Sequence, residues 1–600
     1  MSAASQASAP GHSVPGRPIT IPITTPSSSS STPSALNPPH SPFPESRVLI
    51  IMTGGTICMR PSPDGLVPMD GFLEHAMAPR PSFNDPAPPT TLTAYKDGKR
   101  LELPSLRTPV SAYSRHIRYG ILEFSPLLDS SSISSAGWAE IAQAVKDNYH
   151  LFDGFVVLHG TDSLAYTASA LSFMMSDLGK PVILTGSQAS IFALQSDAVD
   201  NLLGSLIIAG TFVVPEVCLF FHHTLFRGNR TTKVSASSFE AFASPNAAPL
   251  ARVTSLGVDV AWSLVRRPTR IAEFRITTYL DTAHVACFRI FPGIVPEMLD
   301  SVLRVANLRG LILETFGMGN APGGVDGSLT RVIRDAVARG IVVVNVSQCT
   351  NGFVSPLYAP ATALGRAGVV FGHDLTTEAA LTKLSYLLAL DGLSYSDIQE
   401  RMGSSLCGEM TELTSPVFSH PAGALGDSPM VEPSYPHSQL ASLASLAHPQ
   451  EPAVPVSLGA QLAADGALRR LTPIESAFTA LGYAIRNGDL AAVRAVLNGG
   501  AATHSFAMLN TADYAGNTAV HLAAVGPNTD VLRELLMHGA SVHVRNRGNN
   551  TPLFLAEKRG HAGNVKLLRD AGAHLWGPEA EMSKKASGAS KDVTAKAEEA

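Results

Sequence analysis

The sequence predicts an α/β protein with two doubly wound parallel-sheet units, followed by an all-α repeat domain. Three observations support this fold class. Short runs of apolar, mostly β-branched residues recur along the first 400 residues, as is typical of strands buried on both faces of a parallel sheet. Segments with helical spacing separate these runs, and such alternation indicates a doubly wound sheet. Near the end of the chain a motif recurs after 33 residues, which indicates a helical repeat.

Length, charge and cysteine usage limit the class of protein. The 600 residues exceed what one hydrophobic core serves, so several domains are expected. The formal net charge of −5 and the pI near 6.4 argue against a general nucleic-acid binder. We find no apolar run that would span a bilayer and no secretory signal, so no membrane association is expected. The five cysteines lack paired spacing, which favours the cytoplasm and argues against disulfides or a zinc site.

Composition also predicts the domain boundaries. Segments rich in Ser and Pro are expected to be disordered and to separate the folded parts. In chain order we predict a disordered tail at 1–45, a first α/β domain at 46–245, a linker at 246–275, a second α/β domain at 276–414, a disordered linker at 415–470, repeats at 474–577 and a disordered tail at 578–600.

Two glycine–threonine stretches, each directly after an apolar run, are the candidate centre of the protein. Residues 48–51 lead into Thr53-Gly54-Gly55-Thr56, and residues 155–158 lead into Gly160-Thr161-Asp162. Glycine after a strand allows a sharp turn and a close approach by a ligand. Ligands of open α/β sheets bind at the carboxyl ends of the strands, so both threonines are predicted there. Asp162 has a second interpretation, as the N-cap of the following helix.

The remaining elements of the first unit follow in order. The Pro- and Gly-rich segment 58–97 is either a mobile lid or an ordinary surface excursion. Asp129, Ser130 and Ser131 precede a predicted helix at 136–148 and have an alternative role as its cap. Apolar spacing predicts helices at 164–178 and 197–209, and apolar runs predict strands at 181–185 and 217–221.

A polar loop separates this unit from the second. It runs from Arg227 to Lys233 around a glycine, and Lys233 on its own reads as an ordinary solvated lysine. The second unit is predicted to contain strands at 311–313, 341–346 and 369–371, with helices at 329–338, 377–390 and 394–401. The pair Gly317-x-Gly319 lacks the acidic residue of a dinucleotide fold and is weak evidence for a nucleotide.

The repeats at the end of the chain resemble ankyrin repeats. Thr518-Ala519-Val520-His521-Leu522-Ala523 recurs as Thr551-Pro552-Leu553-Phe554-Leu555-Ala556, and a degenerate copy begins at Thr479. Ankyrin repeats have this length and open their first helix with Thr-Pro-Leu-His-x-Ala. About three copies bury a continuous core, and such repeats bind protein partners through their concave face.

The polar residues together suggest attack on a carbonyl group. A threonine hydroxyl is a weak nucleophile and needs a group that accepts its proton, for which Lys233, Asp162 and a tyrosine are candidates. The sequence contains no HExxH, paired CxxC, Walker lysine or GxSxG motif. Metalloprotease, zinc, P-loop and serine-esterase functions therefore lose support.

These motifs resemble the bacterial-type L-asparaginases, in particular the cytosolic type I group. The resemblance rests on Thr53 to Ile57, His159 to Ser163 and Arg227 to Lys233, and it extends over about residues 46–415. It implies an asparaginase fold and hydrolysis of L-asparagine to L-aspartate and ammonia through an acyl-threonine intermediate, without cofactor or metal. It also implies a homodimer or homotetramer. The added ankyrin repeats are similar to the longer animal and fungal members, the 60 kDa lysophospholipase-like asparaginases.

The resemblance also implies roles for individual residues. Thr56 would be the nucleophile, and Thr161, Asp162 and Lys233 would form the second catalytic group. Asp129, Ser130 and Ser131, together with Thr161 and Asp162, would bind the α-amino and α-carboxylate groups of the substrate, which need an acidic group and hydrogen-bond donors. Backbone N–H groups after the glycine turns would stabilise the oxyanion.

Two positions depart from the family pattern. The bacterial enzymes carry a catalytic tyrosine in the lid, where this sequence has Leu66, which cannot relay a proton. Tyr358 is our candidate for its replacement, and an ordinary core tyrosine is the alternative. Glu314 stands where allosteric bacterial members carry an arginine, so recognition of an effector carboxylate is expected to be lost.

Two other functions compete with the asparaginase hypothesis. A catalytically weak asparaginase fold could act as a scaffold through its ankyrin repeats, and the leucine at position 66 favours this slightly. A lysophospholipase-type hydrolase is the other candidate, because relatives with this architecture have been described so. Retention of both threonines, Asp162 and Lys233 favours the asparaginase.

Overall fold

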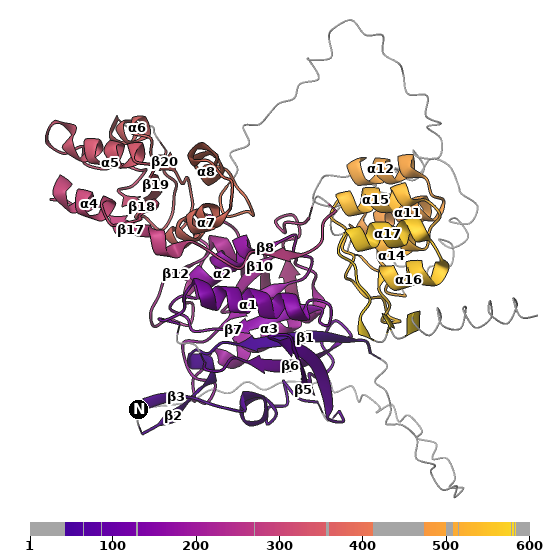
Figure 1. Ribbon diagram of the computed structural model, residues 1–600. Helices are drawn as coiled ribbons and strands as arrows, with labels where there is room; N and C mark the ends of the chain where they lie inside the picture. Colours follow the sequence, from indigo (N-terminus) through magenta and orange to yellow (C-terminus); the bar gives the residue numbers. More distant parts are fainter. Residues whose placement is uncertain are drawn as a thin grey trace, which may run out of the picture. The chain divides into compact units, whose positions relative to one another are not determined.

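The computed structural model describes residues 43–411 and 473–583, apart from short gaps at 64, 86, 128–129, 269–270, 356–358, 500–507, 510, 514, 578 and 581 (Figure 1). The 415–470 linker of the prediction lies outside these residues, as do residues 1–42 and 584–600 of the predicted tails, Asp129 and Tyr358. Within the described part of the chain, no helix combines the length and apolar character needed to cross a membrane.

The first unit is built on a large sheet with ten strands among the described residues. Five central strands run parallel, in the order β10-β9-β7-β1-β6, and antiparallel strands flank them on both sides. The strands are β1 (Glu45–Met52), β4 (Thr90–Lys96), β5 (Lys99–Arg107), β6 (His116–Glu123), β7 (Gly154–Leu158), β9 (Val182–Thr185), β10 (Val217–Phe221), β11 (Thr224–Arg227), β14 (Ala251–Thr254) and β15 (Gly257–Val260). The predicted strands at 181–185 and 217–221 are confirmed.

Helices cover both faces of this sheet. Leu49 and Ile51 of β1 pack with side chains of α1 (Ser135–Asn148) and α2 (Leu164–Met174) in one core cluster. Val48 and Ile50, which point the other way, pack with α3 (Ala198–Thr211) in a second cluster. Burial on both faces explains the continuous apolar run in β1, since neither face can accept polar residues.

The second unit is a smaller doubly wound sheet. Its four strands are all parallel, in the order β17 (Val285–Arg289), β18 (Gly310–Thr315), β19 (Val342–Ser347) and β20 (Val370–Phe371). One core cluster contains side chains of α4 (Pro296–Leu303), α5 (Ser328–Ala338) and α6 (Ala359–Arg366), and the other contains those of α7 (Thr377–Ala389) and α8 (Tyr395–Met402). The prediction of two doubly wound units is confirmed.

Three parts of the first unit differ from the prediction. Residues 246–275, which were predicted to form a linker, contain β14 and β15, and these two strands extend the edge of the large sheet. Residues 58–68 form a hairpin of β2 (Met59–Ser62) and β3 (Gly65–Pro68), and β4 to β6 were not predicted. Strands β4 and β5 are half exposed, whereas β6 is buried but contains Arg118 and Gly120, so no continuous apolar run marks any of the three. Helix α2 ends at Met174 because Met175–Ser176 (β8) pairs with Arg275–Ile276 (β16).

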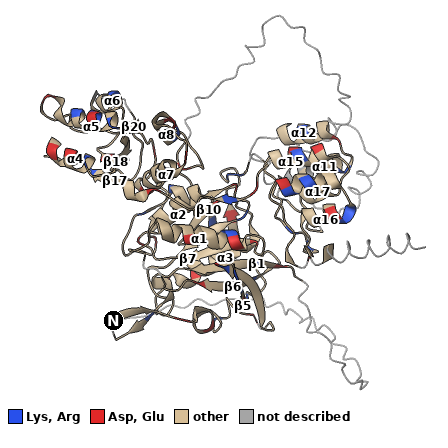
Figure 2. Ribbon diagram, in the orientation of Figure 1, with Lys and Arg blue, Asp and Glu red and all other residues tan. Residues whose placement is uncertain are grey.

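The ankyrin repeats form helix pairs around one shared core. The described helices are α11 (Pro473–Arg486), α12 (Leu490–Gly499), α14 (Ala519–Ala524), α15 (Thr529–Met537), α16 (Pro552–Arg559) and α17 (Ala562–Asp570). The contacts of His521 give a physical reason for the Thr-x-x-His motif of this repeat. Its Nδ1 lies 2.9 Å from the Thr518 hydroxyl, and its Nε2 lies 3.1 Å from the Asn550 carbonyl of the next repeat. Figure 2 shows residues of both charge signs on α15 and α17.

Candidate active site

The two glycine–threonine turns lie against each other at the carboxyl ends of β1 and β7. The backbone N–H of Thr53 donates to the Leu158 carbonyl at 3.0 Å, and its hydroxyl donates to the same oxygen at 2.9 Å. Gly55 has φ of 95°, and a Cβ added there would lie 2.5 Å from the backbone nitrogen of Gly160. Only glycine permits this approach, so the turn brings Thr56 beside the Gly160-Thr161-Asp162 turn.

Lys233 joins Thr161 to Asp162. Its Nζ donates to the Thr161 hydroxyl at 2.9 Å and to the Asp162 carboxylate at 2.8 Å. The side chain of Lys233 is 20% exposed and that of Asp162 is 71% exposed, whereas Thr161 is buried. The alternative interpretation of Lys233 as a solvated lysine loses support, because its side chain is mostly buried and makes these two bonds. The alternative interpretation of Asp162 as an N-cap also loses support, because Ser163 is the N-cap of α2 and makes no side-chain cap bond.

Gln188 is a further member of the site that the sequence analysis did not identify. The Thr161 hydroxyl donates to Gln188 Oε1 at 3.2 Å, while Gln188 Nε2 donates to the Ser238 carbonyl at 3.2 Å. The carboxylate of Asp197 accepts the backbone N–H of Gln188 at 3.1 Å. One signal could have identified Gln188: it follows strand β9 and Gly186 in the same way that Thr161 follows β7 and Gly160.

The second unit holds the loop that carries Lys233. The Arg230 guanidinium makes a two-pronged ion pair with Asp374, at 3.1 and 2.9 Å, and both side chains are buried. The Thr232 hydroxyl donates to the Glu378 carboxylate at 2.6 Å. Lys233 is thus positioned by residues that come about 140 positions later in the sequence.

The serines predicted to bind substrate lie at the same turn. A Cβ added to Gly160 would lie 2.5 Å from the Ser130 Cβ, and the Ser163 hydroxyl donates to the Ser130 carbonyl at 2.5 Å. Ser130 is buried and Ser131 is exposed. Leu66 lies on the hairpin opposite Pro61 and is 48% exposed.

The buried side chain of His159 makes a hydrogen bond within the Gly160-Thr161-Asp162 turn. His159 Nδ1 lies 2.7 Å from the Gly160 carbonyl and must carry the proton there, since a carbonyl only accepts. Its Nε2 then accepts from Thr167, whose hydroxyl oxygen accepts from Trp138 Nε1 at 2.9 Å. Burial lowers the pKa of His159 to about 4, so the imidazole is neutral and serves to orient the turn.

A polar pocket of about 380 Å³ adjoins Lys233 and is walled by the second unit. Glu314, within this pocket, accepts from Arg289 Nε at 2.6 Å and from the Thr377 hydroxyl at 2.7 Å. Among the described residues, no group of three or more His, Cys, Asp or Glu side chains could hold a metal ion.

Fold and site together define a class of protein: a two-unit α/β protein whose polar centre, with two threonines and a lysine, lies at the carboxyl ends of parallel strands. The comparisons agree with this class. Residues 47–266 match the N-terminal asparaginase family model, residues 284–402 match the glutaminase/asparaginase C-terminal domain, and two overlapping segments within residues 463–577 match ankyrin repeats.

Named relatives point the same way. The chain is 33% identical to "L-asparaginase" of Dirofilaria immitis over 88% of this chain and 82% of that protein. It is 43% identical to the "60 kDa lysophospholipase" of Mus musculus over 61% of this chain, and the match spans 63% of the mouse protein, less than two thirds. The structure of L-asparaginase I from Vibrio cholerae matches with a TM-score of 0.51 and 38% identity, covering 61% of this chain and 99% of that one. The chain therefore belongs to the asparaginase family.

Proposed function

We propose that the protein hydrolyses L-asparagine to L-aspartate and ammonia through an ester with Thr56. The observation that supports this most strongly is the pairing of two glycine–threonine turns, one of which is bonded to Lys233 and Asp162. Family membership and the L-asparaginases among the relatives favour this substrate.

The reaction takes place in two steps. The Thr56 hydroxyl oxygen bonds to the amide carbon, and its proton is passed by Lys233 with Thr161 and Asp162, and by Tyr358, to the amide nitrogen, which leaves as ammonia. Water then attacks the ester carbon, which releases L-aspartate and restores the hydroxyl of Thr56. The negative charge on the carbonyl oxygen is stabilised by backbone N–H groups after the glycine turns. Asp129, Ser130 and Ser131 bind the α-amino and α-carboxylate groups.

Trapping the intermediate tests the proposal. Enzyme quenched during turnover of asparagine should carry an acyl adduct on Thr56 by peptide mass spectrometry, and Thr56→Ala and Thr161→Ala should abolish ammonia release. Thr53→Val is a matched control, because this hydroxyl bonds the Leu158 carbonyl: the variant should lose about 1 kcal/mol of stability but keep the adduct. An adduct on any residue other than Thr56 contradicts the proposed mechanism.

The lysophospholipase name of the mouse relative supports a second candidate function, and a weakly active scaffold is a third. Side-by-side assays of asparagine, glutamine and a lysophospholipid, with Tyr358→Phe as a companion variant, separate the three. Asparagine turnover that depends on Thr56 supports the asparaginase function. Cleavage of the lysophospholipid ester without Thr56 supports the lysophospholipase function, and no turnover of any substrate supports the scaffold. We further propose a homodimer or homotetramer in the cytoplasm, where the five free cysteines stay reduced.

A further inference from the structure

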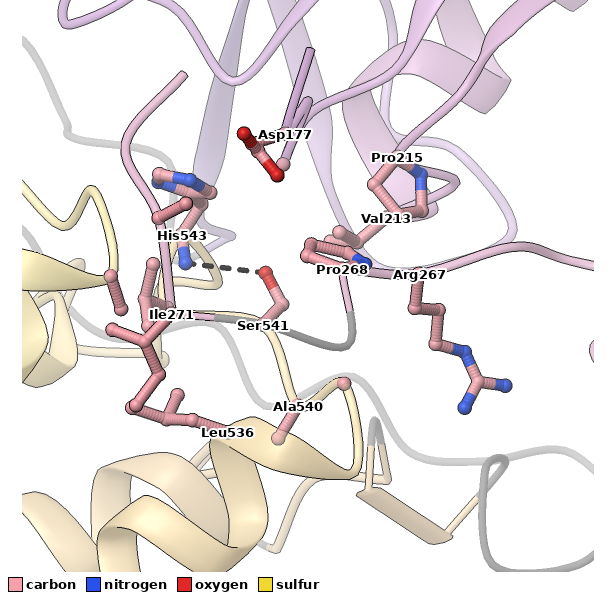
Figure 3. Close-up of a pocket in the computed structure, with 15 residues that line it drawn as sticks. Asp177, Val213, Pro215, Arg267, Pro268, Ile271, Leu536, Ala540, Ser541 and His543 are labelled. Atoms are coloured by element: carbon pink, nitrogen blue, oxygen red, sulfur yellow. Dashed lines mark hydrogen bonds between the residues drawn. The ribbon is translucent and has the colours of Figure 1, made fainter. Parts of the chain in front are cut away.

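Loops of the ankyrin repeats contact the first α/β unit at the edge opposite the candidate active site. The contact residues Arg47, Asp153 and Lys180 lie near the amino ends of β1, β7 and β9, whereas the threonines follow the carboxyl ends. Figure 3 shows His543 and Ser541 of the repeats across a small pocket from Asp177 and Pro215 of the α/β unit. Changes in this contact therefore need not disturb the catalytic groups.

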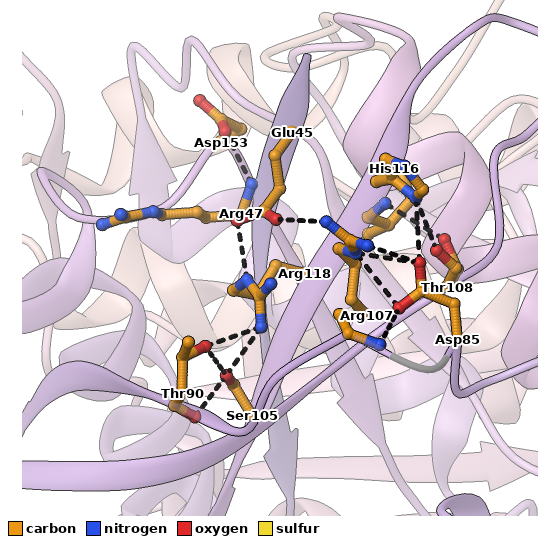
Figure 4. Close-up of polar contacts among 12 residues, drawn as sticks. Glu45, Arg47, Asp85, Thr90, Ser105, Arg107, Thr108, His116, Arg118 and Asp153 are labelled. Carbon is orange, nitrogen blue, oxygen red and sulfur yellow. Dashed lines mark hydrogen bonds and ion pairs between the residues drawn. The ribbon is translucent and has the colours of Figure 1, made fainter. Parts of the chain in front are cut away.

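Trp576 is the aromatic centre of the contact. The guanidinium groups of Arg47 and Arg545 each lie 4.3 Å from its ring, so an arginine of each domain stacks on one indole. Arg545 also forms an ion pair with Asp153 at 3.0 Å. The backbone N–H of Arg47 donates to the Asp153 carboxylate at 2.8 Å. The side chain of Arg47 extends away from Arg118 (Figure 4).

A cluster of cationic and titratable groups lies beside this tryptophan. His574 Nε2 of the repeats faces the Lys180 ammonium group at 3.2 Å, and its ring lies 4.3 Å from that of His150. His574 Nδ1 lies 3.3 Å from the Gly572 carbonyl and so carries the proton. Its Nε2 is therefore the acceptor for Lys180, and a second proton there would set two N–H groups against each other.

His543 fills a second position in the cluster. Its ring meets that of Tyr149 at 5.6 Å and that of His574 at 5.4 Å. It packs directly on Gly179, where an added Cβ would lie 2.5 Å from His543 Cδ2. Lys180 is buried, and its ammonium donates to the carbonyls of Tyr149 and Phe152.

We propose that the ankyrin repeats bind this chain's own α/β unit through this cluster, as an acid-sensitive latch that holds at neutral pH and opens on acidification. The partner of this loop surface is then the protein itself, whereas the separate protein partner predicted from the sequence would bind the concave face of the repeats.

The charges around the cluster give the direction of the pH dependence. From the α/β unit it is faced by Lys180, His150, Tyr149, Asp153, Arg47, Arg115, Glu273 and Asp177, and from the repeats by Arg545. Burial first, then the charge of Lys180, lowers the pKa of His543 and His574 below the ordinary 6.5. Burial also lowers the pKa of Lys180 to about 7.

Because the pKa of each histidine is lower in the closed latch than in the open one, both are neutral in either state well above pH 6.5. As the pH falls below 6.5, the open state takes up protons that the closed state does not, so the free energy of closing becomes less favourable. Each histidine that stays neutral in the closed state but takes up a proton in the open state weakens the latch by about tenfold per pH unit. Because the open-state histidines are already half protonated at pH 6.5, His543 and His574 together should weaken the latch by about thirtyfold between pH 6.5 and 5.5.

Hydrogen exchange of the full chain, corrected for the intrinsic pH dependence, tests the latch. Peptides with residues 149–153 and 572–577 should be protected at pH 7.5 and exchange at least about tenfold faster at pH 5.5. His574→Gln keeps an acceptor for Lys180 but cannot take up the proton, so its opening should shift to lower pH. His561→Gln, at the N-cap of α17, is the matched control and should behave as the parent.

A steric variant opens the latch without a pH change. Gly179→Ala should expose the same peptides at pH 7.5, whereas Gly323→Ala, with no atom closer than 4.0 Å, should not. Peptides of α14 and α15 must stay protected in every variant, which separates opening from unfolding. Equal protection at pH 7.5 and 5.5, an unshifted His574→Gln, or opening that depends on protein concentration would each overturn the proposal.

Discussion

Among single residues, the hydrogen bonds of the Thr161 hydroxyl indicate which threonine, Thr56 or Thr161, is the better candidate nucleophile. Its proton points to Gln188 Oε1, and its oxygen accepts from Lys233. Thr161 therefore cannot pass its proton to Lys233 in this arrangement, which leaves Thr56 as the better candidate nucleophile. Gln188 therefore fixes the direction of the Thr161 hydroxyl.

Gln188→Leu should lower kcat by roughly 10- to 100-fold with a smaller change in KM, because the Thr161 hydroxyl would rotate freely and Lys233 would lose its aligned partner. Steady-state ammonia release measures both constants. Gln188→Glu keeps the acceptor oxygen and should retain more activity than the leucine variant. If the two variants are equally active, Gln188 has no positioning role.

At the scale of elements, segments from the two α/β units are clamped together by buried charge. Arg230 of the first unit pairs with Asp374 of the second, and within the second unit Lys383 of α7 pairs with Glu409 at 2.7 Å with both side chains fully buried. Burial by itself would raise the pKa of Asp374, but the Arg230 and Thr411 donors outweigh it and lower that pKa. This part of the stability is present above the ordinary pKa of 3.8 and is lost as the pH falls below it.

Arg230→Met should cost about 3–5 kcal/mol of unfolding free energy, because it leaves the Asp374 carboxylate buried and unpaired. It should also lower kcat, since Lys233 lies three residues further along the same loop. Urea unfolding and ammonia release measure the two effects. Arg304→Met breaks an exposed pair with Asp300 and should cost far less than Arg230→Met, so equal losses in the two variants would contradict the prediction.

For the whole molecule, the second unit closes the pocket beside Lys233. Glu314 presents a carboxylate there, bonded to Arg289 and Thr377, so this wall offers negative charge in place of an arginine fork. An effector carboxylate at this position would meet repulsion from Glu314 and would have to compete with it for Arg289.

Initial rates should therefore follow a hyperbola in asparagine concentration, with a Hill coefficient of about 1, as expected when no effector couples the sites. Steady-state rates over a wide concentration range check this. Glu314→Arg tests the cause: weak sigmoidal behaviour in this variant alone would assign the difference to the charge. A sigmoidal curve for the parent protein contradicts the prediction.

The sequence by itself determined the elements with strong local signals. Buried strands such as Val48–Ile51 carry continuous apolar runs, and each is followed by its own glycine turn, so the two threonine turns could be placed at strand ends. The ankyrin motif is equally local, since Thr518 and His521 bond within one helix turn. The half-exposed strands β4, β5, β14 and β15 carry no such run, and in the buried strand β6 the residues Arg118 and Gly120 interrupt it, so these strands were missed or assigned to a linker.

Only the tertiary structure decided which distant groups meet. Gln188 touches Thr161 because β7 and β9 are neighbours in the sheet, and Arg230 reaches Asp374 because two units pack together. The contact of Lys180 with His574 joins residues 394 positions apart. No periodicity or spacing encodes such pairs, because each depends on how whole elements pack, and a side chain that looks solvated in the sequence becomes a partner only when another surface covers it.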